Sequence, residues 1–294
     1  MRLEVAGESH PGLVRPDNED AVMYRSPDDH AVTRNKGMLF AIADGVGAYA
    51  GGDTASRTAV EVLASEYYSP RAPGQIEACL GVAMQAANLH VINLGSGVRG
   101  QGSGDEMREA TGGGQFTTDI GSLPSGSRPQ TTLTAMVLAG AQGYVAHAGD
   151  CRLYLLRDSR LSRITSDHSE AAELARLGLI STEQAQTHPR RSVLTRTLGS
   201  TRVLRPDFQR FSVQAGDRLL LCTDGLWSDI DDEALAGPLG WPPAAACDAL
   251  VQMACARGGG DNISLVVVHV IDPGLPPAPT PGRISRLLSS LRGG

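Results

Sequence analysis

Short apolar runs, bounded by glycine or acidic residues, recur along most of the chain. They lie at 38–43, 132–139, 143–147, 152–156, 218–223 and 263–270. Runs of this length, rich in Val, Leu and Ile, predict buried β-strands. Three longer stretches carry apolar residues at three- and four-residue spacing, which predicts amphipathic helices. These stretches lie at 54–66, 75–94 and 243–256.

Very short turns separate two pairs of these runs. Residues 140–142 join the second run to the third, and residues 148–151 join the third run to the fourth. A parallel crossover needs a dozen or more residues, so both connections predict antiparallel neighbours. Local pairing of strands, with long helices grouped between them, favours an α+β layered sandwich over a doubly wound parallel sheet.

Two segments differ in composition from the rest. Residues 95–130 are dominated by Gly, Ser, Gln and Thr, and such a segment buries too little apolar surface to offset its ordering entropy. We expect it to be a flexible insertion. Residues 272–294 begin as a Pro-rich linker and end in a basic segment, which predicts a tail outside the domain. The sequence therefore predicts one domain over residues 1–271.

Charge and cysteine content narrow the class of protein. The formal net charge of −6 argues against a nucleic-acid partner, because nucleic-acid binders present a basic footprint. The five cysteines are scattered and lack C-x-x-C spacing, which indicates reduced thiols. The N-terminal residues lack the apolar core of a signal peptide, and no apolar run has the length of a membrane span. We expect a cytoplasmic monomer.

Aspartates stand at the ends of predicted strands throughout the chain. They are Asp20, Asp44, Asp150, Asp224 and Asp261. Any one of them alone would be a turn residue more often than a metal ligand. If they converge, carboxylates without countercharges repel one another, and a hard divalent cation removes that conflict. Oxygen ligands without Cys or His favour Mg²⁺ or Mn²⁺ over Zn²⁺. The pattern thus predicts a metal site of the kind found in hydrolases.

Six motifs, taken in order, resemble those of bacterial protein phosphatase 2C enzymes. They are Arg15-x-x-Asn18-Glu19-Asp20, Ala43-Asp44-Gly45-Val46-Gly47, Gln130-Thr131-Thr132-Leu133-Thr134, Gly149-Asp150-Cys151-Arg152-Leu153-Tyr154-Leu155, Thr223-Asp224-Gly225-Leu226 and Gly260-Asp261-Asn262-Ile263-Ser264. The resemblance runs from about residue 5 to residue 271. A single Asp-Gly pair is a weak signal, whereas six ordered motifs over this length are a strong one.

The resemblance implies a four-layer α-β-β-α sandwich, two antiparallel sheets flanked by helices, with two Mn²⁺ or Mg²⁺ ions. By position, Asp44 would bridge both ions and the Gly45 carbonyl would contact one of them. The resemblance also implies the remaining ligands of these two ions. Asp224 and Asp261 would hold the first ion, and Asp20 would hold the second largely through water. Asp150, with Asp224, would support a third, weaker ion.

The resemblance also implies the reaction and its partners. Arg15 matches the arginine that clamps substrate phosphate, a role that suits a fork of donors. With Asp20 and Asp44 it would catalyse hydrolysis of phosphoserine and phosphothreonine in proteins by a bridging, metal-activated water. No cysteine lies in a C-x₅-R arrangement, which argues against a thiolate nucleophile. The implied partners are phosphorylated proteins and a cognate bacterial Ser/Thr kinase.

Tyr49 departs from the family pattern, because bacterial members often have histidine there. A tyrosine with an ordinary pKa near 10 is a poor general acid, and a metal-bound water could serve instead. One alternative is a pseudophosphatase that binds phosphoproteins without turnover, although the retained aspartates argue against it. Another two-metal hydrolase, such as a nuclease, is disfavoured by the acidic charge balance.

Overall fold

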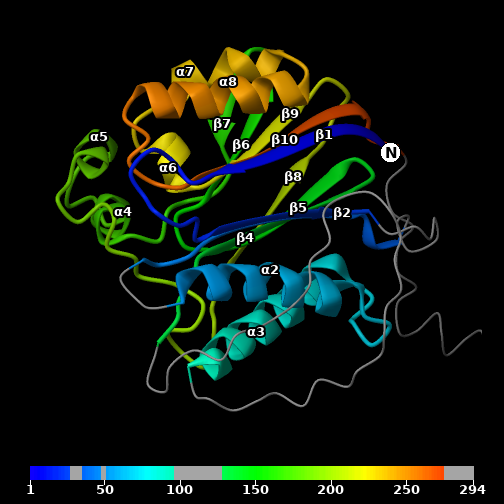
Figure 1. The fold of residues 1–294 in the computed structure, drawn as a ribbon. Coiled ribbons are helices and arrows are strands. Elements are labelled where there is room, and N and C mark those ends of the chain that lie inside the picture. Colours follow the sequence, from blue (N-terminus) through cyan, green and yellow to red (C-terminus); the bar gives the residue numbers. More distant parts are fainter. Residues whose placement is uncertain (27–34, 48–50, 96–127, 275–294) are drawn as a thin grey trace, which may run out of the picture.

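The computed structural model describes residues 1–26, 35–47, 51–95 and 128–274, which form two antiparallel sheets packed face to face (Figure 1). The first sheet contains, in spatial order, β1 (Arg2–His10), β10 (Ile263–Asp272), β9 (Arg218–Cys222), β6 (Arg152–Arg157) and β7 (Arg160–Arg163). The second contains β2 (Asp20–Arg25), β3 (Met38–Asp44), β4 (Leu133–Ala139), β5 (Gln142–Ala148) and β8 (Asp207–Ser212).

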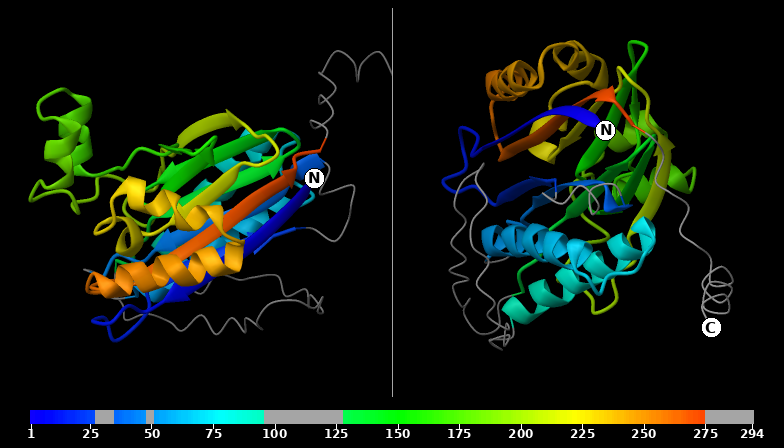
Figure 2. Two further views of the ribbon diagram at one scale, coloured as in Figure 1. Left: turned by 90° about the horizontal axis from the view of Figure 1, so that it is seen from above. Right: turned by 90° about the vertical axis from the view of Figure 1, so that its right-hand side faces the viewer.

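Helices cover the outer face of each sheet, so the predicted α-β-β-α sandwich is confirmed (Figure 1). On the second sheet lie α2 (Gly52–Tyr68) and α3 (Ile76–Leu94). On the first lie α6 (Asp224–Trp227), α7 (Asp232–Ala236), the 3₁₀ turn η1 (Pro238–Gly240) and α8 (Pro243–Ala256). Two short helices, α4 (Glu170–Arg176) and α5 (Thr182–Gln186), project from one end of the sandwich (Figure 2).

Three apolar cores hold these layers together. One lies between α2, α3 and the second sheet, and another lies between α8 and the first sheet. The third lies between the sheets and includes Ile42, Met136, Leu221 and Val266, all fully buried. Interior strands therefore bury both faces, which explains why their sequences are continuous apolar runs and not alternating ones.

The apolar runs predict the six interior strands and miss the four edge strands, of which only β2 was indicated, by the apolar residues after Asp20. The missed strands are β1, β2, β7 and β8, and each lies at one edge of its sheet. β8, with the sequence DFQRFS, alternates between half-buried and exposed residues. Edge strands bury less apolar surface, so their sequences carry a weaker strand signal.

One predicted pairing is wrong. β4 and β5 pair antiparallel as expected, but β5 and β6 lie in different sheets. The four residues 148–151 carry the chain across from one sheet to the other. Gly149 makes this corner with a φ of +122°, and a Cβ there would lie 2.4 Å from Thr132 Cβ. A short connection can thus be a corner between packed sheets as well as a hairpin.

The predicted insertion 95–130 and tail 272–294 lie almost entirely outside the described residues, so both stay predictions. β10 ends at Asp272, next to the proposed domain boundary. Among the described residues, no helix combines the length and apolar character needed to cross a bilayer.

The inter-sheet core predicts a large cost for Leu221→Ala. Leu221 is fully buried and lies opposite both Leu153 and Val266 in the first sheet. The substitution removes buried methyl groups and leaves a cavity, so we expect the free energy of unfolding to fall by about 2–5 kcal/mol in urea denaturation. Leu179→Ala, at a side chain that is 67% exposed, should change it by less than about 0.5 kcal/mol. Equal effects would contradict this packing.

Candidate metal centre

Asp44 is the last residue of β3, and Gly45 follows it. Thr131 and Thr132, which directly precede β4, hold the backbone of Asp44. Thr132 Oγ1 accepts from the Asp44 N–H at 2.9 Å, and the Thr132 N–H donates to the Asp44 carbonyl at 2.8 Å. Thr131 Oγ1 also donates to that carbonyl, at 2.8 Å. These contacts fix the backbone of Asp44 and leave its carboxylate oxygens available.

Gly45 sits where no side chain fits. A Cβ there would lie 2.4 Å from the Gly52 carbonyl oxygen and 2.7 Å from the Glu19 carbonyl oxygen. The Gly45 N–H donates to that Glu19 carbonyl over 3.1 Å. The start of α2 and the chain before β2 therefore converge on the residue that follows Asp44.

Asp20 lies directly opposite Asp44 in the pairing of β2 with β3. Its carboxylate Oδ2 accepts a hydrogen bond of 2.9 Å from Thr223 Oγ1, at the end of β9. Because β2 and β9 belong to different sheets, this contact joins the two sheets at the level of the carboxylates. Asp224, the next residue after Thr223, begins α6.

Asn262, the residue after Asp261, holds the loop that carries Arg15. Its Nδ2 donates to the carbonyls of Pro11 and Asp17 at 2.9 and 2.8 Å. Its Oδ1 accepts from the Glu19 N–H at 2.9 Å. One amide side chain thus fixes both ends of the loop before β2.

Arg15 faces the carboxylates from this loop. Its Nη2 donates to Asp261 Oδ2 at 2.7 Å, and the two side chains are 47% and 40% exposed. The charges of Asp261, Glu19 and Asp224 contribute to the raised pKa of Arg15, the hydrogen bond to Asp261 being the largest cause. The guanidinium therefore lies at the mouth of the carboxylate cluster.

Asp150 lies at the corner where the chain crosses between the sheets. It is 4% exposed, and its Oδ1 is buried without a hydrogen-bond partner among the described residues. Its carbonyl accepts from Trp227 Nε1, at the end of α6, over 3.1 Å. A buried, unpartnered carboxylate oxygen is a costly feature that calls for a ligand or a proton.

The five aspartates interact electrostatically as one group. Burial, followed by the charges of Asp224 and Asp20, raises the pKa of Asp44 well above its ordinary value. Burial raises the pKa of Asp20 to about 8 and, together with Asp261, that of Asp224 to about 6. Burial and Asp224 likewise raise the pKa of Asp150. The structure thus brings together every acidic residue that the sequence nominates.

This donor set fits hard divalent cations. In the part of the chain that the structure describes, no three Asp, Glu, His or Cys side chains already meet as a complete metal site. Like charges without a cation between them repel one another or take up protons. The unpartnered oxygen of Asp150, the crowded backbone at Gly45 and the all-oxygen chemistry fit Mn²⁺ or Mg²⁺.

A cleft opens beside these residues. Asp150, Asp224, Gly225 and Asp261 line it, and so do residues 191–192, which follow α5. The described residues place no histidine in this lining. Tyr49, the residue that stands in place of the expected histidine, lies outside the described residues.

The sequence does not predict several supporting residues. Asn262, Thr131 and Thr132 belong to the family motifs, but their supporting contacts do not follow from the sequence. Trp227, which contacts the Asp150 carbonyl, carries no motif signal. These residues act through contacts made far apart in sequence, which local patterns do not reveal.

Comparisons with known proteins identify the family. The model of the family described as protein phosphatase 2C matches residues 18–247. The serine/threonine protein phosphatase PstP of Mycobacterium tuberculosis is 34% identical over 271 residues, covering 92% of this chain and 45% of PstP. The chain thus spans about half the length of that relative. The serine/threonine phosphatase Stp of Listeria monocytogenes is 31% identical, covering 84% of this chain and 91% of Stp. The chain belongs to the protein phosphatase 2C family.

Solved structures agree with this assignment. The crystal structure of the Mycobacterium tuberculosis phosphatase PstP/Ppp aligns with a TM-score of 0.72 at 32% identity, over 91% of this chain and 98% of the other. The catalytic domain of PstP in complex with two manganese ions aligns with a TM-score of 0.70 at 30% identity, over 92% and 99%. The recognised family resemblance and the predicted fold are confirmed.

The crowding at Gly45 predicts that Gly45→Ala disrupts the centre. The added methyl group would displace the start of α2 or the Glu19 carbonyl, so we expect the free energy of unfolding to fall by about 1–3 kcal/mol. Mn²⁺ affinity, measured by isothermal titration calorimetry, should fall with it. Gly240→Ala is the matched control, since a Cβ there meets nothing within 4 Å. Unchanged stability and Mn²⁺ binding in Gly45→Ala would contradict the described packing.

Proposed function

We propose that this chain hydrolyses phosphoserine and phosphothreonine in proteins with bound Mn²⁺ or Mg²⁺. The observation that carries the proposal is the convergence of buried carboxylates from both sheets beside an open cleft, in a member of the protein phosphatase 2C family. A carboxylate cluster of this charge supports cation binding more readily than it supports any anionic ligand.

The proposed metal ligands are those that the family resemblance implies. Asp44 lies opposite Asp20 in the pairing of β2 with β3 and is influenced electrostatically by Asp224, which supports a bridging role for Asp44 and the Gly45 carbonyl. Asp224 and Asp261 would hold the first ion, and Asp20 the second. Asp150, coupled to Asp224, would support a third, weaker ion. When bound, such ions supply an activated water and neutralise phosphate charge.

Arg15 would orient the substrate phosphate. Its guanidinium pairs with Asp261 at 2.7 Å, so a metal ion on Asp261 would release it toward the cleft. A planar fork of donors matches two phosphate oxygens. Arg15, Asp20 and Asp44 then make up the proposed catalytic set, with the arginine holding the phosphate and the aspartates holding the metal.

The proposed partners are phosphorylated proteins and a Ser/Thr kinase that the phosphatase opposes. The names of the relatives, serine/threonine phosphatases of bacteria, support a substrate of this class. A cytoplasmic location is also proposed, since all five cysteines are unpaired, as in a reducing compartment. A monomeric state remains a prediction from the sequence.

Turnover should depend on metal and on Asp224. With a Ser/Thr phosphopeptide, we expect activity with Mn²⁺, loss of activity with EDTA, and a loss of about 100-fold or more for Asp224→Asn, because removing a ligand charge weakens the metal centre. Asp229→Asn is the matched control, since Asp229 lines the same cleft outside the assigned ligands and should retain activity within about threefold.

The same assay decides between an enzyme and a binding protein. Folded, Mn²⁺-loaded protein that turns over none of several phosphopeptides would sink the enzyme proposal. Tight phosphopeptide binding without turnover would then make the pseudophosphatase the better account.

Arg15→Ala should weaken phosphate binding at saturating Mn²⁺. Hydrogen bonds to charged groups contribute about 1.5–3 kcal/mol each, so kcat/KM for a phosphopeptide should fall roughly 10- to 150-fold. Arg15→Lys keeps the charge and loses the fork, so it should recover only part of that loss. An unchanged kcat/KM in Arg15→Ala would remove Arg15 from the phosphate site.

A further inference from the structure

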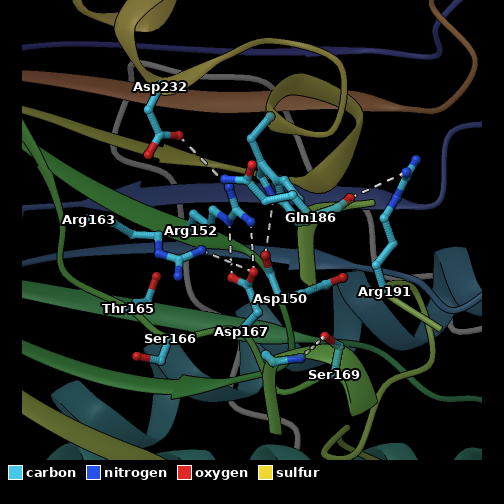
Figure 3. A network of polar contacts seen from close by, with 12 residues as sticks. Asp150, Arg152, Arg163, Thr165, Ser166, Asp167, Ser169, Gln186, Arg191 and Asp232 are labelled. Carbon is cyan, nitrogen blue, oxygen red and sulfur yellow. Dashed lines mark hydrogen bonds and ion pairs between the residues drawn. The ribbon is translucent and has the colours of Figure 1, made fainter. Parts of the chain in front are cut away.

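A buried ion pair lies close to Asp150, one of the candidate metal ligands (Figure 3). Arg152 Nε and Nη2 donate to the two carboxylate oxygens of Asp167, over 3.0 and 2.7 Å. The two side chains are only 8% and 11% exposed. Burying two charges costs several kcal/mol, and apolar replacements of such pairs are often as stable. Stability alone therefore does not account for this pair.

Arg152 stacks on Trp227, which links two of the candidate ligands. The guanidinium carbon lies 3.3 Å from the centre of the indole ring. The indole Nε1 donates to the carbonyl of Asp150 at 3.1 Å. Trp227 is also the last residue of α6, whose first residue is Asp224. The indole thus ties the backbone of one candidate ligand to the short helix that carries another.

Further polar contacts hold the guanidinium in this plane. Arg152 Nη1 donates to Tyr154 Oη at 3.0 Å, and Tyr154 Oη donates to Asp232 at 2.9 Å. Arg163 adds a second cation to Asp167, over 3.1 Å (Figure 3). Although burial opposes it, the guanidinium of Arg152 holds the pKa of Asp167 below its ordinary value. The pair is therefore ionised and its fork geometry is fixed.

His168, the residue after Asp167, makes two hydrogen bonds to Gly149 in the corner that carries Asp150. The Gly149 N–H donates to His168 Nδ1 at 3.1 Å, and the His168 N–H donates to the Gly149 carbonyl at 2.7 Å. The corner at residues 149–150 is therefore clamped between the indole and His168. The ion pair connects these two contacts, because Arg152 stacks on Trp227 and Asp167 directly precedes His168.

Backbone clamps matter here because the Asp150 side chain has little support of its own. Its Oδ1 receives no hydrogen bond from the described residues. The place of this carboxylate consequently follows the place of its main chain.

We propose that the buried pair of Arg152 and Asp167 positions the metal centre by pressing Trp227 against the Asp150 backbone. The pair thereby fixes the spacing between the Asp150 and Asp224 carboxylates. Arg152 and Asp167 act through Trp227 and are positioning residues, since neither lines the cleft. This role rests on the proposed metal-dependent function.

A second buried pair on the same strand provides the control. At the other end of β6, Arg157 Nε and Nη2 donate to the carboxylate of Asp217 at 2.7 and 2.6 Å. Asp217 is 2% exposed, and Arg157 also donates to the Ser212 carbonyl. The chemistry matches that of Arg152 and Asp167, but this pair contacts Ser212 and Gln214, whereas Arg152 stacks on Trp227.

The test is Mn²⁺ titration by isothermal calorimetry of the full chain, with the melting temperature of each variant measured alongside. Arg152→Met should weaken the weakest detected Mn²⁺ site by about 10-fold or more, the usual cost of removing an outer support of a metal site. Arg152→Lys keeps the charge without the fork and should fall between. Arg157→Met should lower the melting temperature but leave every Mn²⁺ affinity unchanged.

Trp227→Phe separates positioning from folding, because it keeps an apolar ring and the ion pair while removing the N–H donor. It should weaken the same Mn²⁺ site, and the double variant Arg152→Met/Trp227→Phe should show less than the sum of the two losses in binding free energy. If Arg152→Met fails to fold, the affinity measured for Trp227→Phe decides the matter.

The two proposals fail in different ways. Equal Mn²⁺ affinities in Arg157→Met and Arg152→Met, or unchanged affinity in folded Trp227→Phe, would overturn the positioning role even if turnover is normal. Mn²⁺ binding without phosphopeptide turnover would contradict the enzyme proposal alone. The Mn²⁺ affinities of the variants would then still decide the positioning role. Failure of the unmutated chain to bind Mn²⁺ would contradict both.

Discussion

Repulsion between buried carboxylates at the seam of the two sheets is the constraint on which the rest of the site depends. Asp20 and Asp44 come from the second sheet, Asp224 from the start of α6, Asp261 from the turn before β10, and Asp150 from the corner between the sheets. Face-to-face packing of the sheets forces these ends together, and the apolar cores supply the stabilisation that offsets the repulsion. Because five carboxylates converge there, the site carries excess negative charge, which divalent cations would balance.

The fold holds two of these aspartates, Asp44 and Asp150, by their backbones. Thr131 and Thr132 fix the main chain of Asp44, and Trp227 fixes that of Asp150. Arg15 contacts the cluster directly through Asp261, and both side chains are partly exposed. Carboxylate oxygens positioned through the backbone keep their lone pairs for ions. That arrangement reconciles rigid placement with a ligand set that remains free to bind.

Sequence patterning predicted the parts of the structure that depend on local composition. The interior strands are apolar because both faces are buried, so all of them were predicted, whereas the half-exposed edge strands β1 and β8 were not. The crossing at Gly149 was mistaken for a hairpin because chain length alone does not distinguish a corner from a turn. The aspartates could be predicted because each lies beside an apolar run in the sequence. Their supports, Asn262 and Trp227, act across more than 70 residues of sequence and leave no local pattern.

The central claim is that the aspartates of both sheets converge in order to hold metal ions. Anomalous diffraction at the manganese edge, from crystals grown with Mn²⁺, tests it most directly. The account predicts anomalous peaks between Asp44 and its neighbours Asp20, Asp224 and Asp261, with Arg15 released from Asp261. Peaks confined to other parts of the surface, with the Arg15–Asp261 hydrogen bond intact, would contradict it.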